Sequence, residues 1–138
     1  SSAEDLAKIW QMYLNKGNYG GRHYIDSATI TEFAKCQYCE ADNKGNRRAA
    51  GFDKPVRGVD GGPTCSCVSY ASFGHTGFTG TISWADPEEN LIYIFLSNRI
   101  YPTAENRKLI SMNVRTDIME VIYASLHETE INPVAVLQ

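Results

Sequence analysis

The chain has 138 residues, of which 43% are hydrophobic and 21% are charged, so we expect one domain that folds around an apolar core. Its net charge is −3 and its nearest basic cluster, residues 44–48, is interrupted by Gly45 and Asn46, which argues against nucleic-acid binding. No apolar run approaches the roughly 20 residues that a membrane-spanning helix requires.

Residues 1–35 are predicted to form two amphipathic helices. Ser1 or Ser2 can cap the first helix, and Asp26 or Ser27 can cap the second. Apolar residues at helical spacing are expected to face inward, namely Leu6, Ile9, Trp10, Tyr13 and Leu14 in the first helix, and Ile30, Phe33 and Ala34 in the second.

Residues 36–72 are predicted to form a long loop with one short strand at residues 48–52. The segment is poor in apolar residues and rich in Gly, Asp, Asn and Pro. Because so long a loop is unusual in a compact domain, we expect it to be functional or to be ordered by another group. Arg47 and Arg48 are expected to flank a solvent-exposed strand.

Residues 81–96 predict an antiparallel hairpin. Side chains at 81–84 alternate between polar and apolar, as in a half-buried strand. Residues 86–90 are typical of a turn, and residues 91–96 are apolar without a break, so the second strand is expected to be covered on both faces.

A long helix is predicted after the hairpin, with Pro102 ending the strand and Thr103 as its cap. Its inward row is expected to be Ile110, Val114, Ile118, Ile122 and Leu126. The predicted fold class is α+β, an antiparallel β-sheet with packing helices. The chain is interpreted as one partial domain, with a helical segment at 1–35, the loop at 36–72, strands and helix at 73–128, and a tail at 129–138.

Residues 74–80, Gly-His-Thr-Gly-Phe-Thr-Gly, form the most informative stretch. Two Thr-Gly pairs lie where a strand begins, and glycines there let another group approach the backbone closely. An amide that points from such a strand into a cleft can donate a hydrogen bond to an oxyanion. The spacing alone equally allows a structural interpretation, in which Gly77 and Gly80 permit only a bulge or tight packing.

His75-Thr76-Gly77 resembles the third motif, usually Lys-Thr-Gly, of the penicillin-recognising serine hydrolases. This superfamily includes class C β-lactamases, DD-peptidases and related esterases. The likeness covers most of the chain and implies the C-terminal part of a β-lactamase/transpeptidase-like fold. Its segments are residues 2–8, 51–53, 73–80 and 84–87, then 94–99 and 101–102.

The resemblance implies roles for several residues. The backbone N–H of Phe78 would be one of two oxyanion donors, and Thr76 and Gly77 would contact substrate. His75 stands where most members have Lys, and a neutral imidazole puts strong selectivity for an anionic substrate in doubt. Asn98 could contact substrate at the cleft edge, but a turn role is equally compatible with its position. The family needs no cofactor.

The chain departs from the family pattern because no Ser-x-x-Lys motif occurs in it. Tyr13-Leu14-Asn15 fits the family's Tyr-x-Asn motif, but it lies on a helical core face and is interpreted as coincidental. We therefore expect a chain that is hydrolytically silent alone and belongs to a hydrolase transferring acyl groups from an ester or amide to water.

The resemblance also implies the context of the chain. The expected partners are a missing N-terminal half of the same domain and a small-molecule or peptidoglycan-type substrate, with a possible homodimer through the surface left uncovered. The expected location is the periplasm or cell envelope.

Four cysteines indicate a possible function other than acyl transfer. Cys36, Cys39, Cys65 and Cys67 could hold a zinc ion, could form disulfides that join the two clusters, or could stay reduced. The alternative function is accordingly a non-catalytic interaction module or a binding module tied by zinc or disulfides.

Overall fold

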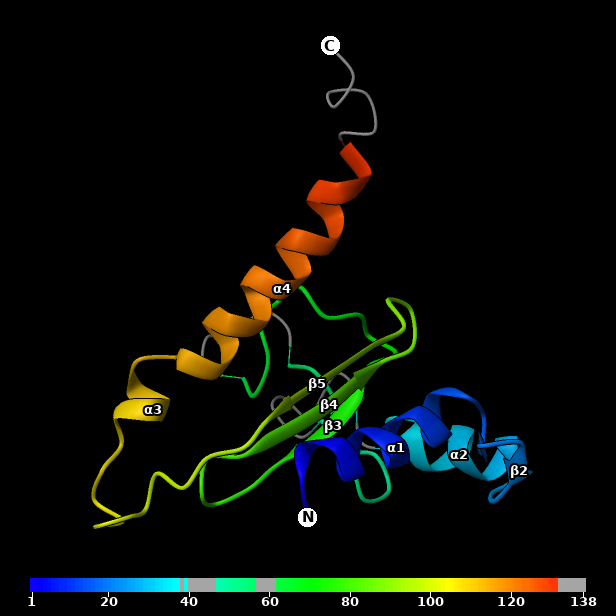
Figure 1. Ribbon diagram of the computed structural model, residues 1–138, viewed down its shortest axis with the longest axis horizontal. Helices are drawn as coiled ribbons and strands as arrows, with labels where there is room; N and C mark the ends of the chain where they lie inside the picture. Colours follow the sequence, from blue (N-terminus) through cyan, green and yellow to red (C-terminus); the bar gives the residue numbers. More distant parts are fainter. Residues whose placement is uncertain (38, 40–46, 57–61, 132–138) are drawn as a thin grey trace.

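The fold is a three-stranded antiparallel sheet with helices on both faces (Figure 1). A computed structural model describes residues 1–37, 39, 47–56 and 62–131. The helices are α1 (Ala3–Leu14), α2 (Ser27–Ala34), α3 (Lys108–Ser111) and α4 (Val114–Ile131). The strands are β1 (Asn18–Tyr19), β2 (Arg22–His23), β3 (Phe73–Thr76), β4 (Ile82–Asp86) and β5 (Leu91–Phe95), so the chain is α+β, as predicted.

The main sheet has the order β3-β4-β5. The predicted hairpin is confirmed, because Ile82 pairs with Phe95 and Asp86 pairs with Leu91. Asn90 closes its turn with a φ of 49°, a left-handed conformation that Asn tolerates well. The strand β3 pairs with the other edge of β4, so the glycine-rich stretch follows an edge strand.

Helix α4 covers one face of the sheet. Trp84 and Ile82 of β4 point to this face and pack in one buried cluster with Met119 and Tyr123 of α4. The expected inward row of the long helix is therefore wrong in part, since Ile110, Ile118 and Leu126 are exposed. The row of Met119 and Tyr123, four residues apart, takes the inward position instead.

The long helix also begins later than Thr103. The polar segment 103–106 precedes α3, and Asn113 separates α3 from α4 with a φ of 53°. A left-handed residue cannot continue a right-handed helix, so it ends the first helical turn. The helix α4 then continues to Ile131, beyond the start of the predicted tail at residue 129.

Helix α1 covers the opposite face, in contact with β4 and β5. Trp10 and Tyr13 of α1 form an aromatic cluster with Phe52 and Phe73, whose neighbouring ring centroids lie 5.1–6.4 Å apart. Tilted and edge-to-face rings at this spacing attract one another beyond their burial. The cluster therefore fastens β3, through Phe73, to the first helix.

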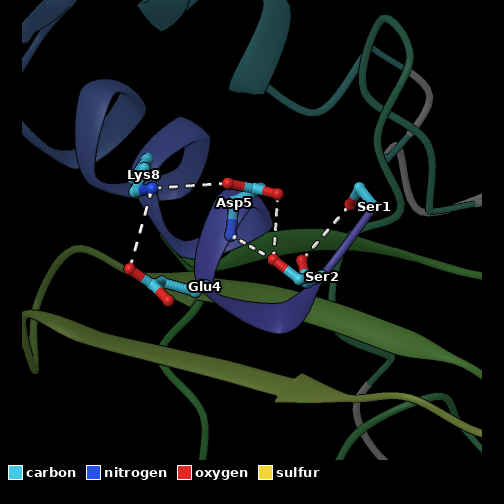
Figure 2. A network of polar contacts seen from close by, with 5 residues as sticks. All are labelled: Ser1, Ser2, Glu4, Asp5 and Lys8. Atoms are coloured by element: carbon cyan, nitrogen blue, oxygen red, sulfur yellow. Dashed lines mark hydrogen bonds and ion pairs between the residues drawn. The ribbon is translucent and has the colours of Figure 1, made fainter.

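The start of α1 is held by a small polar network (Figure 2). Ser2 is its N-cap, as predicted, and the Ser2 Oγ accepts a hydrogen bond from the Asp5 amide at 3.1 Å. The Ser2 hydroxyl also donates to the Asp5 carboxylate, and Lys8 lies 3.3 Å from it. The Ser2 hydroxyl and then Lys8 lower the pKa of Asp5, so the helix keeps a negative charge near its positive end.

Three other expectations need correction. The expected inward faces of the first two helices are wrong at Ile9 of α1 and Phe33 of α2, which are exposed, whereas Ile30 is buried as expected. Asp26 is the N-cap of α2 but makes no side-chain capping bond. The predicted strand at 48–52 is replaced by isolated bridges, Arg48 with Asp53 and Asp53 with Gly74, in the described part of the loop. Among the described residues, no helix is long and apolar enough to cross a membrane.

Candidate functional site

The candidate site lies along the outer edge of β3, which is the edge that faces away from β4. Gly74 exchanges two hydrogen bonds with Asp53, so the main-chain polar groups of Gly74 face away from β4. Main-chain groups alternate in direction along an antiparallel strand, so those of Thr76 face the same way. Beyond Gly74, no strand covers this edge among the described residues. His75-Thr76-Gly77 therefore begins where the outer edge of β3 is no longer paired with Asp53.

A tight loop follows the motif and places Phe78 at its corner. The Gly77 amide donates to Thr81 and the Gly80 amide donates to Gly77, both at 2.9 Å. Gly80 has a φ of 92°, which completes the pattern of a three-residue hairpin loop with a type I turn and a bulge. The Phe78 amide takes no part in this pattern and donates to none of the described residues.

Gly74 permits the close packing of β3 on the sheet. A Cβ at this position would collide with the Trp84 indole and with the carbonyl oxygen of Ser83. Gly80 has a second constraint beside its φ, because a Cβ there would meet Leu109 and Ser97. Structural and functional interpretations of these glycines are thus compatible: they pack the strand tightly, and the loop that they allow leaves one amide unused.

His75 is exposed on the α1 side of the sheet. Its Nδ1 lies 2.7 Å from the Thr76 carbonyl oxygen, which can only accept, so Nδ1 carries the proton. The other ring nitrogen, Nε2, is then an acceptor in the neutral ring. His75, Thr76 and Gly77 all line one cavity of about 340 Å³, whose far wall includes Leu6 of α1.

Phe78 presents its ring to solvent, with 72% of its surface exposed. The Arg99 guanidinium lies 5.0 Å from the ring centroid, within the range of a cation–π contact. Two carbonyl oxygens, of Ala104 and Asn106, hold the guanidinium in place. The Phe78 ring therefore rests on a charged group that is itself anchored.

Asn98 makes no side-chain hydrogen bond with His75, Thr76 or Gly77 among the described residues, although its segment runs beside the loop that follows them. It lies just after β5, on the side of β4 that is away from β3, and it is exposed. Its carbonyl oxygen accepts a hydrogen bond from the Tyr101 amide, which is a turn contact. The turn role that the sequence allowed is therefore visible. The two neighbours of Asn98 both bind the loop after the motif, because the Ser97 hydroxyl and the Arg99 amide donate to the Thr79 carbonyl oxygen.

The four cysteines form two short-range disulfides, Cys36–Cys39 and Cys65–Cys67. Two of the alternatives that the sequence left open, disulfides between the two clusters and reduced cysteines, are therefore wrong. Cys65 packs in the core under α4, whereas Cys36 follows α2, which lies beside α1 at the other side of the sheet (Figure 1). The described residues contain no group of three or more His, Cys, Asp or Glu side chains placed to hold a metal ion.

A buried carboxylate was missed by the sequence reasoning. Asp86 is 1% exposed, and it accepts hydrogen bonds from the Ser69 amide and hydroxyl, the Glu88 amide and the Tyr123 hydroxyl. Burial alone would raise the pKa of Asp86, but these bonds outweigh it and lower the pKa. The network joins the end of β4 to α4 and to the segment that enters β3. In the sequence, Asp86-Pro87 indicated only a turn.

A buried lysine was also missed. Lys54 is 5% exposed, and its Nζ donates to the Ala71 carbonyl oxygen at 3.0 Å. Burial, followed by the nearby charge of Arg47, lowers the pKa of Lys54 to about 8. The expectation that Arg47 and Arg48 flank an exposed strand is wrong for the strand, because Arg48 forms only an isolated bridge with Asp53. Arg48 is exposed, as expected, whereas Arg47 is half-buried and lines a cavity beside β3 together with Lys54.

The fold and the placement of the motif define an α+β unit of the β-lactamase type. The model of the Beta-lactamase family matches residues 1–112, and the chain belongs to this family. A β-lactamase structure from Mycobacterium bovis superposes with a TM-score of 0.68 at 19% identity, over 91% of this chain and 44% of that one. The superposition shows the fold, and the family match places the chain among serine β-lactamases and penicillin-binding proteins.

Curated relatives include proteins named putative D-alanyl-D-alanine carboxypeptidase. Those from Salmonella gallinarum and Salmonella typhi are each 30% identical over 111 residues, which is 79% of this chain and 24% of each relative. The chain thus spans about a quarter of the length of these relatives.

Proposed function

We propose that this chain supplies the third-motif strand to the acyl-transfer site of a serine hydrolase. In the reaction, a serine oxygen attacks an ester or amide carbonyl, the leaving group departs with a proton, and water then hydrolyses the acyl-enzyme. The serine and its base would come from sequence outside these 138 residues. The length of the curated relatives, about four times the matched segment, supports this division.

The observation that carries the proposal is the unused Phe78 amide. It lies at the corner of the loop, two residues after Thr76, at the open part of the outer edge of β3. An amide fixed by a tight turn needs no reorganisation when negative charge forms on a carbonyl oxygen, which is the basis of oxyanion stabilisation. The Phe78 amide would thus be one of the oxyanion donors.

His75 would act through Nε2. Because Nδ1 is committed to the Thr76 carbonyl oxygen, the neutral ring offers Nε2 as an acceptor for a hydroxyl of the site or of the substrate. A lysine at this position would instead present a fixed positive charge. Thr76, which lines the same cavity, would position the substrate with its hydroxyl.

The named relatives support a peptidoglycan-type substrate and a location in the cell envelope, since they are described as D-alanyl-D-alanine carboxypeptidases. An ester substrate fits the same geometry, because the oxyanion donor contacts the carbonyl oxygen and not the leaving group.

The test compares two substitutions of Phe78 in the full-length protein. Phe78→Pro removes the amide hydrogen, and proline is favoured at this corner of a type I turn, so the loop should persist. Phe78→Ala removes the same ring but keeps the amide. Relative to Phe78→Ala, we expect Phe78→Pro to lower kcat by about 10²–10³-fold on a chromogenic ester, with a much smaller change in KM.

Equal kcat values for the two variants, with equal thermal stability, would exclude the amide as a donor. A second measurement tests the division of the site. The 138-residue chain alone should not hydrolyse the ester, and turnover that a serine-directed covalent inhibitor abolishes would contradict the proposal. Hydrolysis by neither the chain nor the full-length protein would favour a non-catalytic interaction module.

A further inference from the structure

A cavity beside β3 gathers positive charge in a chain whose net charge is −3. Its volume is about 480 Å³, and its basic lining residues are Arg47, Arg48, Lys54 and Arg115. Asp53 is the one acidic residue that lines it in the described part of the chain. The cations come from the loop before β3 and from α4, so the fold and not a sequence cluster brings them together.

The single carboxylate does not neutralise this group. Asp53 is already paired with Arg48, at 2.6 Å. Lys54 donates to a carbonyl oxygen, and the Arg115 Nη1 donates to the carbonyl oxygens of Gly80 and Thr81. These partners satisfy hydrogen bonds but bring no negative charge. The buried Asp86 carboxylate is close enough to Lys54 to favour its charged form, but it does not line the cavity, and the charges of Arg47 and Arg115 have no carboxylate partner among the described residues.

Arg47 is the least satisfied of the four. Its guanidinium lies 5.6 Å from the centroid of the Tyr70 ring, and its Nε is buried without a hydrogen-bond partner among the described residues. An unpaired buried N–H of a charged group costs free energy, which an added acceptor would recover. A charged acceptor would also relieve the repulsion between Arg47 and Lys54.

The shape of the cavity indicates the kind of anion. A volume of about 480 Å³ exceeds what an inorganic ion fills, and apolar side chains line another part of the wall, including Pro63, Leu109 and Ile110. Such a wall favours an apolar substituent on the ligand, because burying it removes apolar surface from water.

We propose that this cavity binds an organic anion with a carboxylate head and an apolar tail. Arg47 and Lys54 bind the carboxylate, and the tail lies against Leu109 and Ile110. The site is separate from the His75 cavity, although Thr76 lines both. It requires no serine nucleophile, so it can hold whether or not the chain takes part in acyl transfer.

The experiment uses the 138-residue chain and hexanoate as the probe. Hexanoate should bind saturably, with affinity that falls as salt is added, and it should shift the NMR signals of Arg47, Lys54 and Thr76. Arg47→Gln and Lys54→Met should each weaken binding by about 10-fold or more, as expected for loss of a charge-assisted hydrogen bond. Arg22→Gln, an exposed arginine on β2, is the matched control and should leave the affinity unchanged.

Three further probes test which chemical features of the ligand the cavity recognises. Hexanamide, which has the same shape without the charge, should not bind measurably, and inorganic phosphate should bind more weakly than hexanoate. Hexanamide binding equal to that of hexanoate would overturn the role of charge, and stronger phosphate binding would overturn the organic tail. Acetate should bind more weakly than hexanoate. Absence of saturable hexanoate binding, or equal losses in Arg22→Gln and Arg47→Gln, would overturn the site itself.

Discussion

Tyr123→Phe tests whether the buried Asp86 carboxylate stabilises the fold through its hydrogen bonds. The substitution deletes one hydroxyl and leaves the ring of a residue that is 2% exposed. That hydroxyl lies 2.7 Å from the Asp86 carboxylate, and a hydrogen bond to a charged group contributes about 1.5–3 kcal/mol. We therefore expect the free energy of unfolding to fall by about 2 kcal/mol at neutral pH.

Tyr93→Phe provides the matched control. The Tyr93 hydroxyl donates to the Arg115 carbonyl oxygen at 3.0 Å, which is a neutral acceptor, and Tyr93 is also buried. Its loss should cost about 1 kcal/mol. Urea unfolding followed by circular dichroism measures both values, provided that the slopes with denaturant agree.

The pH dependence sharpens this test. The folded-state pKa of Asp86 lies below its ordinary value of 3.8, so its stabilisation is present above pH 3.8 and is lost as the pH falls through the folded pKa. The extra cost of Tyr123→Phe should shrink over that range, and the variant should unfold in acid at a higher pH than the parent. Equal costs for the two tyrosines at neutral pH, or a difference that acid does not change, would refute the reasoning.

Three further predictions concern other parts of the fold. Gly74→Ala should destabilise the chain by about 2 kcal/mol or more in urea unfolding, because the new Cβ meets the Trp84 indole; an unchanged midpoint would show that β3 can move away. The stability of the chain should rise between pH 8 and pH 10.5, because unfolded chains bind a proton on Lys54 that the folded state releases, and Lys54→Met should abolish this rise in the same assay. Peptide mapping without reductant should find each disulfide within a single tryptic peptide, and a cross-linked pair of peptides would contradict the observed pairing.

The sequence alone predicted those elements whose local residue pattern is compatible with one type of secondary structure. Ser2 and the helical spacing up to Tyr13 predicted α1, and alternation followed by an apolar run predicted the hairpin of β4 and β5. The placement of the third motif at the end of an edge strand also agrees with the resemblance that the sequence offered.

The remaining features depend on tertiary contacts that a single sequence does not contain. Helix α4 has two adjacent apolar rows, and only the position of Trp84 in the sheet selects Met119 and Tyr123 over Ile118. In the sequence, Asp86 cannot be told from any other aspartate in a turn. Only the fold brings Tyr123, 37 residues away, within hydrogen-bond distance of it. Arg47 and Arg115 lie far apart along the chain, so a cavity lined by both was not predictable from composition.

The corner position of Phe78 has a consequence for how such a protein can vary. The candidate donor at this point is a main-chain N–H that donates to none of the described residues, and Phe78 as a residue is 72% exposed to solvent. Exchange of the side chain would therefore remodel the rim of the candidate site and leave the N–H in place, with proline as the exception. A saturation library at this codon should separate substrate preference from the hydrogen bond itself, because every other replacement retains the donor.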